Sequence, residues 1–536
     1  YYDKKYSTSM YGKAGIPMNT KNNFFKKRIP EDVEEALLNV LIKERIDQPI
    51  ETPSENFSQF NYNLVAYNKT ASWMLLLERE MGVAAFDSLM KAYYNQWKFK
   101  HPYPQDFKNL AEAIAGKSLD ATFAFLGTTG ALEKEPDRKI KLQSFFNLNR
   151  DQHYVSALPL VGANKYDKLM IGGMLHNYTL PAPNLLFFAA PLYSTGAKML
   201  TGIARIGYHF FPGPTNARLE IALAGSRFSK DVFTDSLGKS HYLEFSKLVP
   251  SLLYTFKNIP GSTIRKTIQW KSFLINERNY LFTLDTTLNQ YNITYPIKQR
   301  VLNQLNLQVS NSRKLYPYQV TLQAEKGKYF IKSNVTSHYF FNYAKGGGLQ
   351  VRLFAGKFFY TKEKSLANFD TYRYWYNMTG ANGFEDYTYS NYFIGRNEFE
   401  GLLSQQIMIK DGGFKIRTDL LSAKYGRSDD WLGAMNFCTT IPKKILPLPI
   451  KLFADLGTYA EAWDKDAPTG KFVYDVGLQL SVLKNVINIY FPLIYSKPYR
   501  DYVKSYIPEK RFQKNISFSI DVQNLNIKRF FPQSPF

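Results

Sequence analysis

The sequence predicts two parts of different class, a helical lobe followed by a transmembrane antiparallel β-barrel of about 12–16 strands. Apolar residues recur with a period near 3.6 in the first 128 residues and with a period of 2 from about residue 152. The longest strongly apolar run, residues 185–193, is far shorter than the ~18 residues that a transmembrane helix needs. A chain of 536 residues also exceeds a single core. We expect a helical lobe over 1–128, a linker over 129–151 and a barrel over 152–536.

The first part contains four segments with helical patterning, at 31–45, 67–80, 83–97 and 102–116. The first segment has acidic residues in its opening turn and Lys43 and Arg45 in its last, which suits the helix dipole. The fourth has Asp106 in a capping region and ends at Gly116. Residues 129–150 are charged and weakly periodic, so they are expected to form the linker.

The second part alternates between apolar and polar residues. From Phe472 to Val482 every second residue is apolar, while the other face carries Asp475 and Gln479. Such segments recur at least a dozen times, which is typical of strands with lipid on one side and a wet lumen on the other. The polar face is too rich in charge for the interior of a soluble sandwich, although a large soluble all-β domain is the alternative.

The charge distribution points to an anionic membrane surface. The net charge is +23, of which residues 1–150 contribute +3 and residues 151–536 contribute +20. No helix-turn-helix, zinc-finger or RNA-binding aromatic motif is present, so nucleic acid is not an expected partner. The expected partners are outer-membrane lipid and lipopolysaccharide, unless the basic residues line the lumen. The one cysteine, Cys438, can form neither an internal disulfide nor a thiolate-built metal site.

The helical part resembles the end of the catalytic domain in aminopeptidase-N-like (gluzincin) zinc metallopeptidases. Tyr67-Asn68-Lys69-Thr70-Ala71 is similar to the Y-x-K-G-A helix of that family, with Thr70 in place of the usual Gly. Asp106-Phe107 fits the family's P-x-x-D-F start, and the opening YYDKKY looks like the residues that follow its third zinc ligand. Residues 166–172 and 200–208 resemble the barrel that follows such domains in outer-membrane proteins of Bacteroidetes-type bacteria.

The resemblance implies peptide hydrolysis by zinc-activated water, with Tyr67 as the catalytic residue that donates a hydrogen bond to the oxyanion. Tyr67 as an aromatic packed on the core is the alternative, and Lys69 is expected to be structural with its ammonium in solvent. The sequence lacks H-E-x-x-H and any pair of histidines at helical spacing, so no metal ligand is predicted within it. The zinc ligands are expected upstream in the parent polypeptide, and an inactive descendant is the rival interpretation.

Together these features predict an outer-membrane β-barrel protein carrying a zinc metallopeptidase-like domain that would act on a peptide. The alternative is a non-enzymatic channel, or a subunit of a secretion or assembly complex, with a degenerate peptidase scaffold. Because an even number of strands returns both barrel ends to one side, the N-terminal lobe is expected in the periplasm. The aromatic segment 370–393 is expected to pack over the barrel mouth or join an aromatic girdle, with an external binding loop as the alternative.

Overall fold

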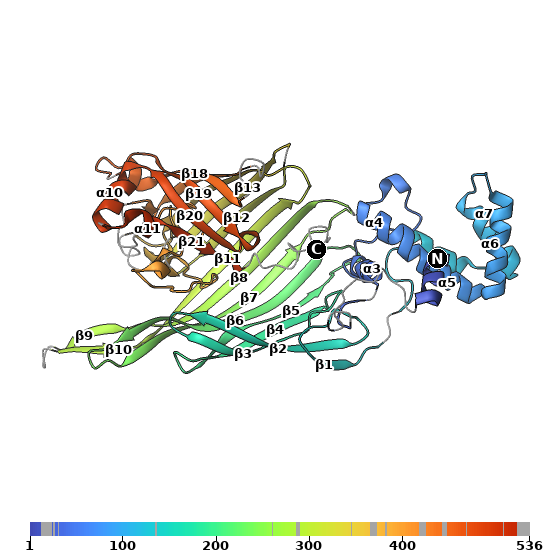
Figure 1. Ribbon diagram of the computed structural model, residues 1–536, viewed down its shortest axis with the longest axis horizontal. Coiled ribbons are helices and arrows are strands. Elements are labelled where there is room, and N and C mark those ends of the chain that lie inside the picture. The colour runs from blue at the N-terminus through green and yellow to red at the C-terminus, as the bar shows by residue number, and fades with distance from the viewer. Residues whose placement is uncertain are drawn as a thin grey trace.

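The fold comprises an N-terminal helical lobe and one large curved sheet, which Figure 1 shows side by side. The computed structural model describes residues 1–11, 24, 27–30, 32–134, 137–259, 261–285, 290–344, 346–364, 372–380, 383–417, 425–441, 448–467, 469–507 and 509–522. Among these residues, no helix is both long enough and apolar enough to cross a membrane.

The described part of the lobe is built from short helices. They are α1 (Tyr2–Tyr11), α3 (Val33–Lys43), α4 (Gln59–Asn63), a π-helical turn η2 (Leu64–Lys69), α5 (Thr70–Met81), α6 (Val83–Trp97), α7 (Pro104–Ala115) and α8 (Asp120–Ala124). The Asp32 side chain caps α3 by accepting from the Glu35 amide. Gly82, at φ 84°, separates α5 from α6, and Gly116 ends α7 in the left-handed region.

Two small apolar clusters hold the lobe together. One packs α5, α6 and α7 around Trp73, Leu77, Phe86 and Leu89, and the other packs α3 against the π-helical turn. Beside them Lys69 is buried, and its ammonium lies 2.8 Å from the Asp47 carboxylate. The expectation of a solvated Lys69 is therefore wrong, because the π-helical turn directs this side chain inward onto a buried acid.

In the described part of the chain the sheet contains 17 strands: β2 to β21 form a continuous antiparallel meander of 16, within the 12–16 expected, and β1 adds one parallel strand at its edge. The strands are β1 (Ile140–Ser144), β2 (His153–Asn164), β3 (Lys168–His176), β4 (Leu185–Ser194), β5 (Leu200–Phe210), β6 (Arg218–Thr234), β7 (Ser240–Thr255), β8 (Ile264–Arg278), β11 (Ile297–Asn311), β12 (Tyr318–Lys326), β13 (Phe330–Asn342), β14 (Gly348–Tyr360), β17 (Trp431–Thr440), β18 (Ile450–Tyr459), β19 (Val473–Val482), β20 (Ile487–Tyr495) and β21 (Ser517–Ile520). The hairpin β9 (Leu281–Asp285) and β10 (Gln290–Thr294) extends from the β8–β11 connection.

The predicted alternation of faces is confirmed. On β14, Leu353 and Phe359 are exposed on the convex outer face, whereas Arg352, Phe354 and Phe358 are buried on the concave inner face. The same holds in β19, where Tyr474 and Val482 are exposed and the alternate residues between them are buried. A period of 2 therefore fixes which residues face outward.

The two ends of the sheet differ. We call the end at which β2 begins the near end; its connections, such as 211–217 and 343–347, contain nine residues or fewer. The opposite far end carries the long connections 361–430 and 496–516, the second of which holds α10 (Lys497–Tyr506) and α11 (Arg511–Asn515).

The helical lobe contacts the near end. Arg218, at the start of β6, lies 2.8 Å from Glu44, and the Arg45 guanidinium donates to the carbonyls of Gly213 and Thr215 in the β5–β6 connection. Gly261, in the β7–β8 connection, lies close to Ser58 of the lobe. A Cβ added at Gly261 would come within 2.8 Å of the Ser58 side chain. Strand β1 forms within the segment expected to be a linker; the domain boundaries themselves remain predictions.

The buried Lys69–Asp47 pair gives the first prediction. Lys69→Ala leaves the Asp47 carboxylate buried without its charged partner, which should lower the local unfolding free energy of α5 by about 3–5 kcal/mol. Hydrogen exchange of the full chain measures this loss as reduced amide protection. The exposed Lys91 of α6 provides the control variant Lys91→Ala. Equal protection of α5 in the two variants would contradict the structural role of Lys69.

Candidate functional site

The concave face of the sheet is occupied by the chain's own β14–β17 connection. We call its described residues, 372–380, 383–417 and 425–430, the inner segment. It contains little regular structure beyond short turns and the two-residue strands β15 (Tyr376–Asn377) and β16 (Arg427–Ser428). In Figure 1 it lies between the long green strands and the orange-red strands β17–β21. Most of its side chains are buried, so it packs closely against the concave face of the sheet.

Aromatic side chains pack the inner segment against the wall. The Tyr389 ring stacks on Phe245 of β7 with centroids 3.8 Å apart. The Tyr376 ring contacts Phe354 and Phe358 of β14 edge-on and covers Gly356, where an added Cβ would approach the ring to 2.4 Å. These aromatic residues belong to the predicted segment 370–393. The expectation that it packs over the barrel mouth is wrong, because its rings find apolar partners deeper on the inner wall.

Glu277 of β8 forms the first charged attachment. Its carboxylate, which is 1% exposed, accepts from Arg300 of the neighbouring β11 and from Arg373 of the inner segment, the latter at 2.9 Å. The Tyr389 hydroxyl donates to the same carboxylate. Lys247 of β7 adds to this attachment by donating to the backbone carbonyls of Thr388 and Tyr389.

Lys415 forms a second charged attachment on the opposite wall. Its ammonium lies 2.6 and 2.8 Å from the two carboxylate oxygens of Asp455 on β18. Asp475 of β19 accepts from the backbone amides of Lys415 and Ile416 at 2.9 and 2.8 Å. The buried Arg352 of β14 donates at 2.7 Å to the carbonyl of Asp411. The expected wet lumen is therefore wrong for these residues: the inner segment, not water, satisfies the wall charges.

The inner segment also lies at the seam between the first and last strands of the meander. Strand β1 covers the near-end part of the β2 edge by parallel pairing. Towards the far end, the Lys165 amide donates to the Ile394 carbonyl, and the Tyr392 hydroxyl donates to the Ala163 carbonyl. On the other side, the Ile407 amide donates to Phe518 of β21 at 2.7 Å. Within the described ranges no pairing joins β21 directly to β1 or β2.

The predicted catalytic residue lies away from the inner segment, in the π-helical turn of the lobe. Tyr67 is 61% exposed, and its ring contacts Tyr62 edge-on with centroids 5.8 Å apart. A hydrogen bond with Tyr62 raises the pKa of the Tyr67 hydroxyl. Tyr67 is thus not a buried core aromatic. Its role as an oxyanion donor remains a prediction.

The residues present do not fit a zinc ion. Across the described ranges, no group of three or more His, Cys, Asp or Glu side chains is placed to hold a metal. The expectation that the zinc ligands lie upstream in the parent polypeptide remains a prediction.

Comparisons with known proteins give no family assignment. No family model and no curated protein matches the sequence. Among solved structures, BamA from Haemophilus ducreyi lacking POTRA domains 1–3 has a TM-score of 0.36 at 11% identity, covering 63% of this chain and 66% of that chain. CdiB from Acinetobacter baumannii has a TM-score of 0.31 at 10% identity, covering 63% and 55%. The copper transporter OprC has a TM-score of 0.24 at 11% identity, covering 67% and 53%.

The chain thus spans about half to two-thirds of the length of these solved chains. At TM-scores this low the likeness carries no argument about fold or function. The geometry of the sheet and of the inner segment is therefore the basis for assigning a role to this chain.

The Lys415–Asp455 pair gives the second prediction. Lys415→Met removes the cation from a buried pair, which should lower the free energy of detaching this part of the inner segment by about 3 kcal/mol or more. The detached fraction then rises about 100-fold, and so does the rate of trypsin cleavage at Lys410 and Arg417 in detergent.

The exposed Lys504 of α10 gives the control variant Lys504→Met, which should leave that rate unchanged. A cleavage rate equal in wild type and Lys415→Met would show that the pair does not hold the segment.

Proposed function

We propose that this chain is an outer-membrane protein whose sheet closes into a barrel around the inner segment and works as a shut conduit that opens when the segment moves. In this role it is a channel or a subunit of a secretion or assembly complex. The observation that carries the proposal is the attachment of the inner segment to opposite walls, by Glu277 on one side and by Asp455 on the other.

The outer face supports placement in a membrane. Exposed aliphatic side chains occupy its middle, among them Ile221, Leu252, Leu274, Leu305, Leu353 and Leu456. Exposed aromatic side chains gather at the near end, including Tyr208, Phe256, Tyr316, Phe341 and Tyr343, and at the far end, including Tyr193, Tyr280, Phe359, Trp463 and Phe472. An apolar band between two aromatic rows matches the hydrocarbon core and interfaces of a bilayer.

The connections support the orientation. Bacterial barrels have short periplasmic turns and longer external loops. The near end, with its short connections and the docked helical lobe, therefore corresponds to the periplasmic side, and the far end to the exterior. The proposed partners are outer-membrane lipid and lipopolysaccharide around the sheet, and other subunits of an outer-membrane complex.

The third prediction tests the conduit. In planar bilayers the wild-type chain should conduct rarely, because the inner segment fills the enclosed space. The double variant Glu277→Gln/Lys415→Met removes a charge from each attachment and should produce frequent, sustained openings. Lys504→Met serves as the matched control and should conduct as wild type does.

Two results would overturn the conduit. A wild-type chain that conducts freely would show that the segment does not shut it. A double variant that inserts and exposes its segment to trypsin, yet never conducts, would show that no passage lies behind the segment.

A second candidate function is the predicted peptidase role, which the exposure of the Tyr67 hydroxyl on a π-helical turn favours. If a parent protein containing this chain hydrolyses peptides, Tyr67→Phe should lower turnover by about 10²–10³-fold by removing one oxyanion donor. Stability should stay the same, because the side chain is mostly exposed. Steady-state kinetics of the intact protein measure the effect, with Tyr94→Phe, an exposed tyrosine of α6, as the control. Unchanged turnover in Tyr67→Phe would remove the only catalytic residue assigned to this chain.

A further inference from the structure

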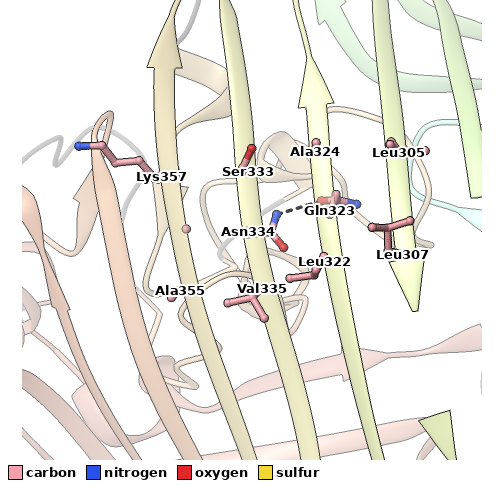
Figure 2. Close-up of a pocket in the computed structure, with 11 residues that line it drawn as sticks. Leu305, Leu307, Leu322, Gln323, Ala324, Ser333, Asn334, Val335, Ala355 and Lys357 are labelled. Atoms are coloured by element: carbon pink, nitrogen blue, oxygen red, sulfur yellow. Dashed lines mark hydrogen bonds between the residues drawn. The ribbon is translucent and has the colours of Figure 1, made fainter. Parts of the chain in front are cut away.

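The outer face of the sheet contains a hollow across β11, β12, β13 and β14, with a volume of about 460 Å³. Its side chains form two transverse rows on the outer face. One row is Leu305, Ala324, Ser333 and Lys357, and the next, towards the near end, is Leu307, Leu322, Val335 and Ala355. Figure 2 shows these residues along the four strands.

Small side chains create the hollow. Ala324 and Ser333 lie between the longer Leu305 and Lys357 in one row, and Ala355 follows Val335 in the other. Beyond Ala355 the neighbouring residue of β17 is Gly433. The floor is thus low, while Leu305, Leu307 and Leu322 form an exposed apolar rim.

Positive charge borders the hollow on its far-end side. Lys357 closes the first row, and Lys326 follows Ala324 on the same face of β12. Lys328 and Lys362 lie over the Tyr329 ring at 4.5 and 4.8 Å, in the adjoining connections. Asp430 contacts Lys357, but this pair is partly exposed and therefore easily exchanged for another anion.

We infer that this hollow binds one phosphate-bearing acyl lipid of the membrane's outer leaflet. The acyl chain lies on Ala324, Ser333 and Ala355 between the leucines, and the phosphate meets Lys326 and Lys357. A site that is apolar in the middle of the sheet and basic near one end matches the two ends of such a lipid. The inference rests on the proposed membrane placement with the far end outside.

The test uses the full chain in phosphatidylcholine nanodiscs that contain a small fraction of lipid A with a photoreactive group on an acyl chain. After illumination, cross-linked peptides from β11–β14 should dominate over those from the rest of the outer face. Lys326→Gln and Lys357→Gln should each lower this labelling about fivefold, the effect of about one surface charge. Lipid A without phosphates should label the same peptides weakly.

Two further variants fill the hollow without changing charge. Ala324→Leu and Ala355→Leu should also reduce the labelling of β11–β14. Their controls are Ala204→Leu on the outer face of β5 and Lys266→Gln on the outer face of β8, which should leave it unchanged.

The outcomes separate the two proposals. If the chain inserts but labelling is even over the outer face, or is unaffected by both the lysine and the alanine variants, the lipid site is wrong and membrane placement stands. If the chain does not insert into nanodiscs at all, membrane placement fails and the lipid site with it. Equal labelling by lipid A with and without phosphates would contradict recognition of the headgroup.

Discussion

Charged side chains on the concave face of the sheet need partners, and this need determines how the inner segment packs against that face. A charge removed from water is stable only when it is paired and hydrogen-bonded. Glu277 and Asp455 receive cations from the inner segment, and Arg352 receives a carbonyl oxygen from it. Without that segment these wall residues would face either water or one another. The sheet and the segment inside it therefore depend on each other for polar satisfaction.

The same segment resolves a second problem, the unpaired edges of the first and last strands. Strand edges expose amides and carbonyls that invite pairing with other chains. Here β1 and residues 392–394 cover parts of the β2 edge, while Ile407 bonds to β21. The inner segment thus satisfies wall charges and also covers the parts of the strand edges that β1 leaves open, so a displacement that frees the wall charges also exposes those edges.

The parts that the sequence predicts well are those governed by local period. The alternation that places Leu353 outward and Arg352 inward follows from the two-residue repeat of a strand, and the helices beginning near Val33 and Val83 follow from capping and amphipathic pattern. The 16 strands of the antiparallel meander lie at the upper end of the expected 12–16, whereas the parallel strand β1 is missed because its five residues are too few to show a period.

Long-range contacts are the parts that local pattern does not reveal. Lys415 and Asp455 are 40 residues apart, and Glu277 and Arg373 are 96 apart, so nothing nearby in the sequence identifies them as pairs. A polar inner face is equally compatible with a water-filled lumen and with an interior occupied by a segment of the chain. Family resemblance alone points to Tyr67, and the structure adds its exposure.

The docking of the helical lobe has a mechanical consequence. The lobe contacts the near end where β6 and β8 begin: its Glu44 pairs with Arg218, and its Ser58 lies against Gly261. Farther along the β7–β8 hairpin, Lys247 and Glu277 hold the inner segment. Strands paired by continuous hydrogen bonds transmit displacement along their length with little stretch. A displacement of the lobe at the near end therefore has a direct path along β7 and β8 to the attachment at Glu277, whereas the attachment on β18 and β19 lies on strands for which no contact with the lobe is described.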